Sequence, residues 1–211
     1  SILRIPFSII APVIIVICAI GAYTVHNAML DIWFMLLFGI IDVGNYAWTL
    51  NEYEKATQMG TRYAAVTNMV SPALETQSYV GVTCNGTALR DGDRICREAL
   101  GTMQCSSTGC QCVAGPCPAG QMDNARFQAL VTRLRRFQPE IVAGDVRVEY
   151  RGSGLGYAGD PNPPEIAPLV TVRIVNATYT PIVLSPFGVA VPLPDFSYSL
   201  TLEDGEGATS S

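Results

Sequence analysis

The sequence has little charge and almost no histidine. Charged residues make up 15 % of its 211 residues, against about 25 % in an ordinary globular chain, and the deficit lies mainly in the first forty residues. The formal net charge of −5 argues against nucleic acid as a partner, because phosphate binding needs a clustered basic surface. The only histidine is His26, so the rest of the chain has no base for a Ser-His-Asp or Cys-His arrangement. We therefore predict a non-enzymatic protein without a cofactor.

The cysteine-rich and glycine-rich motifs of the sequence do not match known metal or nucleotide sites. The run Cys105-x4-Cys110-x-Cys112-x4-Cys117 lacks the close pairs of structural zinc and the spacing of plant-type iron–sulfur sites. The glycine-rich stretch from Gly152 to Gly159 is followed by Asp160-Pro161 and further prolines. It therefore cannot open the helix on which a dinucleotide phosphate would sit. We predict no metal site and no nucleotide site.

The chain begins with a long apolar segment. Phe7 to Val25, FSIIAPVIIVICAIGAYTV, contains no charged residue and is long enough to span a bilayer. His26 and Asn27 follow as a short polar break. Residues 1–27 are accordingly predicted to be a transmembrane segment.

A second helix is predicted over residues 28–70, and we call it the spine helix. Leu30 to Val70 contains no proline, and Ile32 to Ile41 is unbroken apolar sequence suited to lipid. Polar residues enter at Asp42, but an apolar seam continues at steps of three and four, which keeps one stripe on one helix face. The seam residues are Val43, Tyr46, Leu50, Tyr53, Thr57, Gly60 and Ala64. Such a helix would start in the membrane and finish against a soluble domain; the alternative is a soluble core helix.

Six cysteines are concentrated in the soluble part of the sequence, within a loop region predicted over residues 84–117. They are Cys84, Cys96, Cys105, Cys110, Cys112 and Cys117. An even, dense cluster of this kind is typical of disulfides formed in an oxidising compartment, the bacterial periplasm or the extracellular side. Of the 15 pairings that six cysteines allow, only Cys84 with Cys96 is favoured. Two membrane crossings, with Arg4 favouring a cytoplasmic N-terminus, would return these cysteines to the cytoplasm.

Residues 71–211 are predicted to form an extracytoplasmic α+β domain. Ser71-Pro72 ends the spine helix, and residues 71–122 show no sustained period, so we expect a disulfide-bonded loop region. Asp123 to Phe137 predicts a capped amphipathic helix. Strands are predicted at Val146–Arg151, Leu169–Val175 and Phe196–Leu202. The fold class is thus α+β: a membrane helix or helix pair, the spine helix, a small antiparallel sheet packed on it and one further helix.

From Phe38 onward, the chain resembles the TadE-like pilus-assembly proteins of bacterial tight-adherence secretion systems. The resemblance is carried by FGIIDVGNYAWTLNEYEKATQMGTRYAAV from Phe38, VRVEYRGSGLGYAGDP from Val146, PLVTVRI from Pro168 and PDFSYSLTLED from Pro194. It implies a minor pilin-like component anchored in the cytoplasmic membrane, with its soluble domain outside. The partners would be membrane lipid and other pilus-assembly and pilin-like proteins. We hypothesise that the spine helix packs laterally on them through small residues, namely Gly39, Gly44, Ala47, Gly60 and Ala64.

Residues 1 to about 40 depart from that pattern. A TadE-like protein brings a glutamate-bearing segment into its helix, whereas this chain has no glutamate before Glu52. Its first forty residues, SILRIPFSIIAPVIIVICAIGAYTVHNAMLDIWFMLLFGI, instead resemble an internal piece of the large membrane subunit of tripartite tricarboxylate transporters, the TctA-like family. We therefore expect a chimera with its junction near Phe38-Gly39-Ile40. Two alternative functions remain open: a transport-subunit fragment fused to a pilus-type domain, and an extracytoplasmic adhesion or binding module.

Overall fold

The computed structural model describes residues 7–118 and 120–202, with side chains from Met29 onward. The chain divides into two compact units. Unit 1 comprises Ser1–Ala47 with Thr180–Ala190, and unit 2 comprises Trp48–Tyr179 with Val191–Ser211. The predicted α+β class is confirmed by a long helix, antiparallel sheets and disulfide-bonded loops.

Helix α1 runs over Phe7–Val66 without interruption. The polar break predicted at His26 and Asn27 is therefore wrong: both residues are helical, and two polar residues without proline or glycine do not suffice to end a helix. The predicted membrane segment Phe7–Val25 lies in the part of α1 whose side chains are not described. The spine helix ends at Val66 rather than Val70, and the short helix α2, Pro72–Glu75, begins with a proline at its first position, where its missing N–H is not needed.

Helix α3, Asn124–Arg135, forms where the capped amphipathic pattern predicts it. The carboxylate of Asp123 accepts hydrogen bonds from the backbone N–H groups of Ala125 at 2.9 Å and Arg126 at 3.2 Å. The apolar face predicted from the sequence is buried, except that Phe137 lies past the helix end and is half-buried. The buried residues are Phe127, Leu130, Val131 and Leu134.

The main sheet has five antiparallel strands in the order β4-β3-β5-β6-β9. The three predicted strands are three of these five and lie side by side: β5 Val146–Arg151, β6 Leu169–Ile174 and β9 Phe196–Thr201. The register pairs Val148 with Val172, and both side chains are fully buried. Arg147 and Arg173 are paired on the other face, so the sheet has one buried and one polar face.

Strands β3, Thr102–Ser106, and β4, Gly109–Ala114, correct the prediction that residues 71–122 form only loops. Met103 and Cys105 are buried while their neighbours in β3 are half-exposed, so the period of two is present. It is hidden in the sequence because the alternating residues are threonine, glutamine, cysteine and serine. Strand β4 is mostly exposed at the edge of the sheet and shows no apolar pattern.

Several short elements complete the fold. Two small hairpins, β1–β2 and β7–β8, and the 3-10 helices η1, η2 and η3 lie between the longer elements. Their bounds are β1 Thr83–Cys84, β2 Thr87–Ala88, β7 Thr178–Tyr179, β8 Val191–Pro192, η1 Arg97–Ala99, η2 Ala143–Asp145 and η3 Ser185–Phe187. η3 belongs to unit 1 and the others to unit 2.

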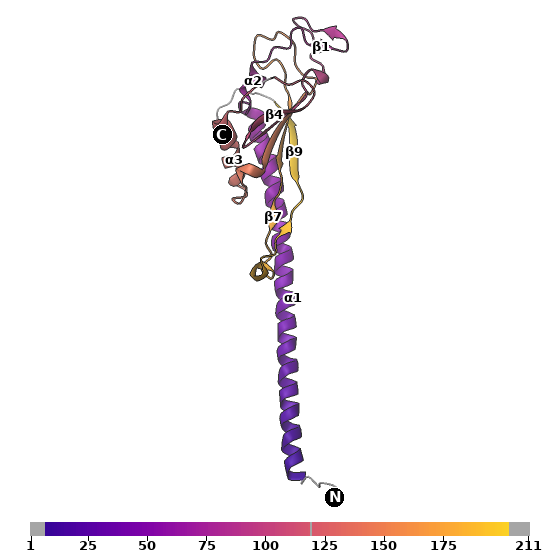
Figure 1. The fold of residues 1–211 in the computed structure, drawn as a ribbon, viewed down its shortest axis with the longest axis vertical. Helices are drawn as coiled ribbons and strands as arrows, with labels where there is room; N and C mark the ends of the chain where they lie inside the picture. The colour runs from indigo at the N-terminus through magenta and orange to yellow at the C-terminus, as the bar shows by residue number, and fades with distance from the viewer. Residues whose placement is uncertain (1–6, 119, 203–211) are drawn as a thin grey trace. The chain divides into compact units, whose positions relative to one another are not determined.

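The core of unit 2 lies between the buried face of the sheet and the C-terminal part of α1 (Figure 1). Tyr53 stacks on Phe196 of β9, with ring centroids 5.1 Å apart, and the Thr61 hydroxyl donates to the Tyr198 carbonyl at 3.1 Å. Gly60 brings α1 against α3, since a Cβ at this position would lie 2.3 Å from Leu134 Cδ2. The sheet is therefore packed on the helix, as the sequence predicts.

Candidate functional site

Residues of α1 in unit 1 present an exposed apolar surface. Large apolar side chains from Met29 to Ile41 are between 42 % and 66 % exposed. Among the described residues, one helix is long and apolar enough to cross a membrane, and it extends over Met29–Val66. Only 6 % of its most apolar window is buried within the molecule, so this window is not packed as the core helix of a soluble protein would be.

Asp42 ties this helix to a distant loop of the same unit. Its carboxylate accepts hydrogen bonds from the backbone N–H groups of Ile182, at 2.7 Å to Oδ1, and Val183, at 3.0 Å to Oδ2. Asp42 is 9 % exposed, and such bonds compensate for the cost of burying a carboxylate. Sequence reasoning missed this contact, because the two segments lie 140 residues apart in the chain and no local pattern links them.

The seam residues of α1 are more exposed at the N-terminal end of the seam and buried at its C-terminal end. In unit 1 Val43 is 69 % exposed and Tyr46 is half-buried; Leu50, in unit 2, is also half-buried. Tyr53, Thr57, Gly60 and Ala64 are buried within unit 2. Gly60 and Ala64 are thus already packed within the chain, Gly60 against Leu134 of α3, and packing on neighbouring proteins stays a prediction. Gly39 and Gly44 have nothing within 4 Å of an added Cβ.

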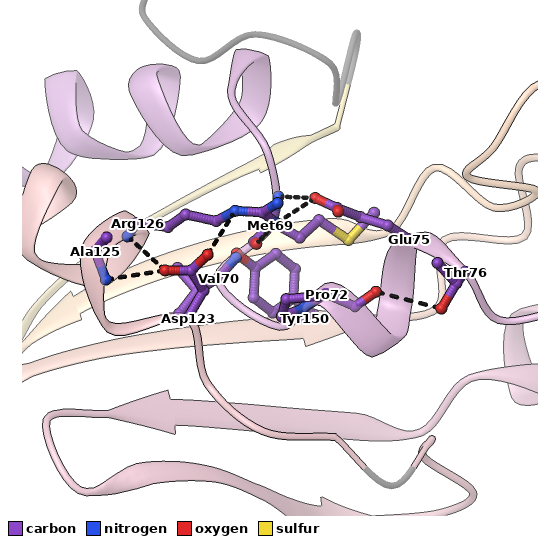
Figure 2. Close-up of polar contacts among 9 residues, drawn as sticks. All are labelled: Met69, Val70, Pro72, Glu75, Thr76, Asp123, Ala125, Arg126 and Tyr150. Atoms are coloured by element: carbon purple, nitrogen blue, oxygen red, sulfur yellow. Dashed lines mark hydrogen bonds and ion pairs between the residues drawn. The ribbon is translucent and has the colours of Figure 1, made fainter.

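A polar cluster closes the C-terminal end of α1 (Figure 2). Arg126 Nη1 donates to the Met69 carbonyl and to Glu75 Oε1, both at 2.7 Å, and its Nε lies 3.2 Å from Asp123 Oδ2. Glu75 Oε1 also accepts from the backbone N–H of Met69 at 2.7 Å. Carbonyl and N–H groups just beyond a helix end need such partners, so the cluster fixes the exit of the chain from α1.

Tyr150 completes the cluster from strand β5. Its hydroxyl accepts a hydrogen bond from the backbone N–H of Val70 at 2.9 Å. Burial raises the pKa of Tyr150 above its usual value, and Glu75 raises it further, while the Val70 N–H and Arg126 act in the opposite direction. Tyr150 is therefore neutral at physiological pH and acts as a structural acceptor.

A shallow groove of about 250 Å³ adjoins this cluster. It is lined by residues of α1 and α3, including Tyr63 and Arg126, by Asn68 just beyond the end of α1, and by Tyr150 of β5. Its volume lies below the range of about 300 to 1,000 Å³ typical of ligand pockets, and Arg126 and Tyr150 are engaged within the cluster. We interpret the groove as a gap in the packing of two helices and not as a ligand pocket.

Three disulfides join all six cysteines of the Cys-rich region. Cys84 bonds to Cys96, the pair that the sequence favours, Cys105 bonds to Cys110, and Cys112 bonds to Cys117. The Cys105–Cys110 bond joins residues directly opposite each other in the β3–β4 hairpin. Within the described part of the chain, no group of three or more histidine, cysteine, aspartate or glutamate side chains is placed to hold a metal ion.

Comparison with known proteins finds one relationship, confined to the start of the chain. Residues 1–51 match the tripartite tricarboxylate transporter TctA family. The match covers about a quarter of the 211 residues and supports the resemblance of the first forty. It runs through Phe38-Gly39-Ile40, where a junction is predicted, and ends at Asn51. No curated protein and no solved structure matches the chain, so the resemblance of the later residues to TadE-like proteins remains a hypothesis.

Proposed function

We propose that the chain is a non-enzymatic, membrane-anchored component of a bacterial envelope assembly of the tight-adherence pilus type. One observation carries the proposal: helix α1 contains both an exposed apolar segment and the buried core segment of a disulfide-bonded domain. A helix of this kind attaches a domain to the membrane. Its role is that of an anchor and an assembly surface.

The disulfides favour a soluble domain on the oxidising side of the cytoplasmic membrane. Three disulfides within Cys84–Cys117 would not persist in a reducing cytoplasm. A single crossing by α1 then leaves unit 2 in the periplasm or outside the cell. A reporter enzyme that needs disulfides for activity, fused after Leu202, should be active, whereas a cytoplasmic fluorescent reporter at the same position should be dark.

Lateral packing of α1 on other membrane helices would use the segment from Gly39 to Gly44. Both glycines have open space where a Cβ would be, and close approach of helix backbones favours such residues. Replacing Gly44 with leucine should reduce co-purification with pilus-type membrane proteins from the native bacterium. Gln128→Leu, at an exposed position of α3, should leave co-purification unchanged. Equal recovery with both variants would contradict the assembly surface.

A second candidate is a membrane transport subunit fragment fused to the later domain. The observation that favours it is the match of residues 1–51 to the tripartite tricarboxylate transporter TctA family. This candidate predicts that uptake of a radiolabelled tricarboxylate by intact cells requires the chain and is lost when residues 1–51 are exchanged for an unrelated membrane helix. The anchor proposal predicts unchanged uptake with that exchange, provided that unit 2 remains attached to the membrane.

A further inference from the structure

The loop Thr180–Ala190 of unit 1 exposes large apolar side chains and carries no charge. Ile182 is 50 % exposed, Leu184 37 %, Phe187 77 % and Val189 42 %. The uncharged run extends on both sides of the loop, since no charged residue occurs between Arg173 and Asp195. Exposed large apolar residues concentrated in one short loop mark a contact site rather than an ordinary surface turn.

Several backbone N–H groups of the loop are paired within unit 1. The N–H groups of Ile182 and Val183 donate to Asp42, and those of Ser185, Phe187 and Gly188 donate to the carbonyls of Pro181, Leu184 and Ser185. The Ser185 hydroxyl also donates to the Ile182 carbonyl at 3.0 Å. A backbone whose groups are paired internally loses little when it leaves water. Exposed apolar side chains on a loop with several paired N–H groups suit contact with lipid.

We propose that the Thr180–Ala190 loop is a second membrane contact, which inserts its apolar side chains among the lipids beside α1. The occupant is the bilayer, at the boundary between headgroups and acyl chains, because the loop belongs to the same compact unit as the exposed apolar residues of α1. Asp42 accepts hydrogen bonds from the loop and thereby joins it to the helix, and we expect the exposed apolar residues of both segments to face the same lipid. This inference depends on the proposed membrane attachment of α1.

Photo-crosslinking tests the proposal with the full chain in phospholipid vesicles. The photoreactive residue p-benzoyl-phenylalanine replaces Phe187 in one variant, Ile40 of α1 in a second and Val113 of strand β4 in a third. Ile40 is 65 % exposed and Val113 58 %, so the three positions are comparably accessible. After illumination, mass spectrometry of the peptides counts lipid adducts.

We expect lipid adducts at Phe187 and Ile40, and about tenfold fewer at Val113. Adducts at Ile40 with none above the Val113 level at Phe187 would overturn the loop inference while leaving the anchor intact. If Ile40 gave no lipid adduct above the Val113 level, the proposed membrane anchor itself would be overturned. A protein–protein crosslink at Phe187 in place of the lipid adduct would show that another chain covers the loop, and would also overturn the inference.

The role of Asp42 is tested in the same vesicles. Asp42→Ala removes both acceptors of the Ile182 and Val183 N–H groups and should lower the Phe187 adduct several-fold. The Ile40 adduct serves as the control and should not change, because α1 remains apolar. Asp42→Asn retains one carbonyl oxygen and should give an intermediate yield. An unchanged Phe187 yield in Asp42→Ala would show that the carboxylate does not hold the loop.

Discussion

Two buried tyrosines of unit 2 differ in how their hydroxyl groups are satisfied. The Tyr150 hydroxyl accepts from the Val70 N–H, whereas the buried Tyr79 hydroxyl has no hydrogen-bond partner among the described atoms. Buried polar groups normally find partners, and an unmade bond costs the full desolvation of the group. Both side chains are less than 2 % exposed. Removing the hydroxyl from each therefore compares a paired with an unpaired buried group.

The first prediction follows from this difference. Tyr150→Phe should lower the free energy of unfolding by about 1–3 kcal/mol, because it leaves the Val70 N–H buried without a partner. Tyr79→Phe should change it by less than about 0.5 kcal/mol or stabilise the protein, since it removes an unpaired hydroxyl. Denaturant unfolding in detergent measures both values. Equal losses of unfolding free energy in the two variants would mean that the Val70–Tyr150 hydrogen bond does not stabilise the fold.

The same tyrosines predict a loss of stability at alkaline pH. Burial raises the pKa of Tyr150 and of Tyr79 above the usual value, and Glu165 raises that of Tyr79 further. A folded-state pKa above the unfolded value means that the contribution to stability is fully present below about pH 10 and is lost as the pH rises beyond it.

Each of these tyrosines should remove up to about 1.4 kcal/mol per pH unit above pH 10. Denaturant midpoints at pH 8 and pH 11 measure the effect, and Tyr79→Phe should reduce the difference between them. An unchanged difference in that variant would show that Tyr79 ionises equally easily in the folded and unfolded states.

Gly60 allows α1 and α3 to approach each other. A Cβ at this position would lie 2.3 Å from Leu134 Cδ2 and 3.2 Å from its Cγ, and Leu134 is fully buried. Gly60→Ala should therefore destabilise unit 2 by about 1–3 kcal/mol through overpacking. Gly44→Ala is the control, because Gly44 has nothing within 4 Å and alanine is the better helix former. A loss of thermal stability in the control but not at Gly60 would contradict this packing.

At the scale of elements, the disulfides hold together a region with little apolar core of its own. The Cys84–Cys96 bond spans 12 residues, and the Cys112–Cys117 bond spans 5. In the chain-entropy model a longer closed loop gives more stabilisation. Replacing both members of Cys84–Cys96 with alanine should cost about 3 kcal/mol, and replacing both members of Cys112–Cys117 about 2 kcal/mol. Thermal unfolding of the exported variants shows which of the two loses more stability. A larger loss without Cys112–Cys117 would contradict the chain-entropy model.

The elements predictable from the sequence are those whose signal is local. Strands β5, β6 and β9 alternate apolar and polar residues, and α3 begins with a capping Asp123 before a helical apolar period. Strands β3 and β4 were missed because their alternating residues are small, polar or cysteine. The Asp42 contact could not be predicted because its partners lie 140 residues away in the chain, and no local period indicates such a pairing.

At the scale of the whole molecule, α1 contributes to both compact units. Its residues up to Ala47 belong to unit 1, and those from Trp48 to Val66 belong to unit 2. Tyr53, Ala56 and Ala64 are at most 4 % exposed within unit 2. Unit 2 should therefore depend on the C-terminal part of α1 but not on its apolar N-terminal part.

A pair of truncations directed to the periplasm tests this dependence. The fragment 48–211 should fold with its three disulfides intact, because it retains the helix segment that stacks on Phe196 and contacts α3. The fragment 67–211 should not fold, because it loses several buried side chains whose burial is comparable with a total stability of about 5–15 kcal/mol. Both fragments carry Phe187→Ser to limit self-association through the apolar loop. Circular dichroism and resistance to proteolysis distinguish the two, and a protease-resistant fragment 67–211 would show that α1 is an anchor only and not part of the core.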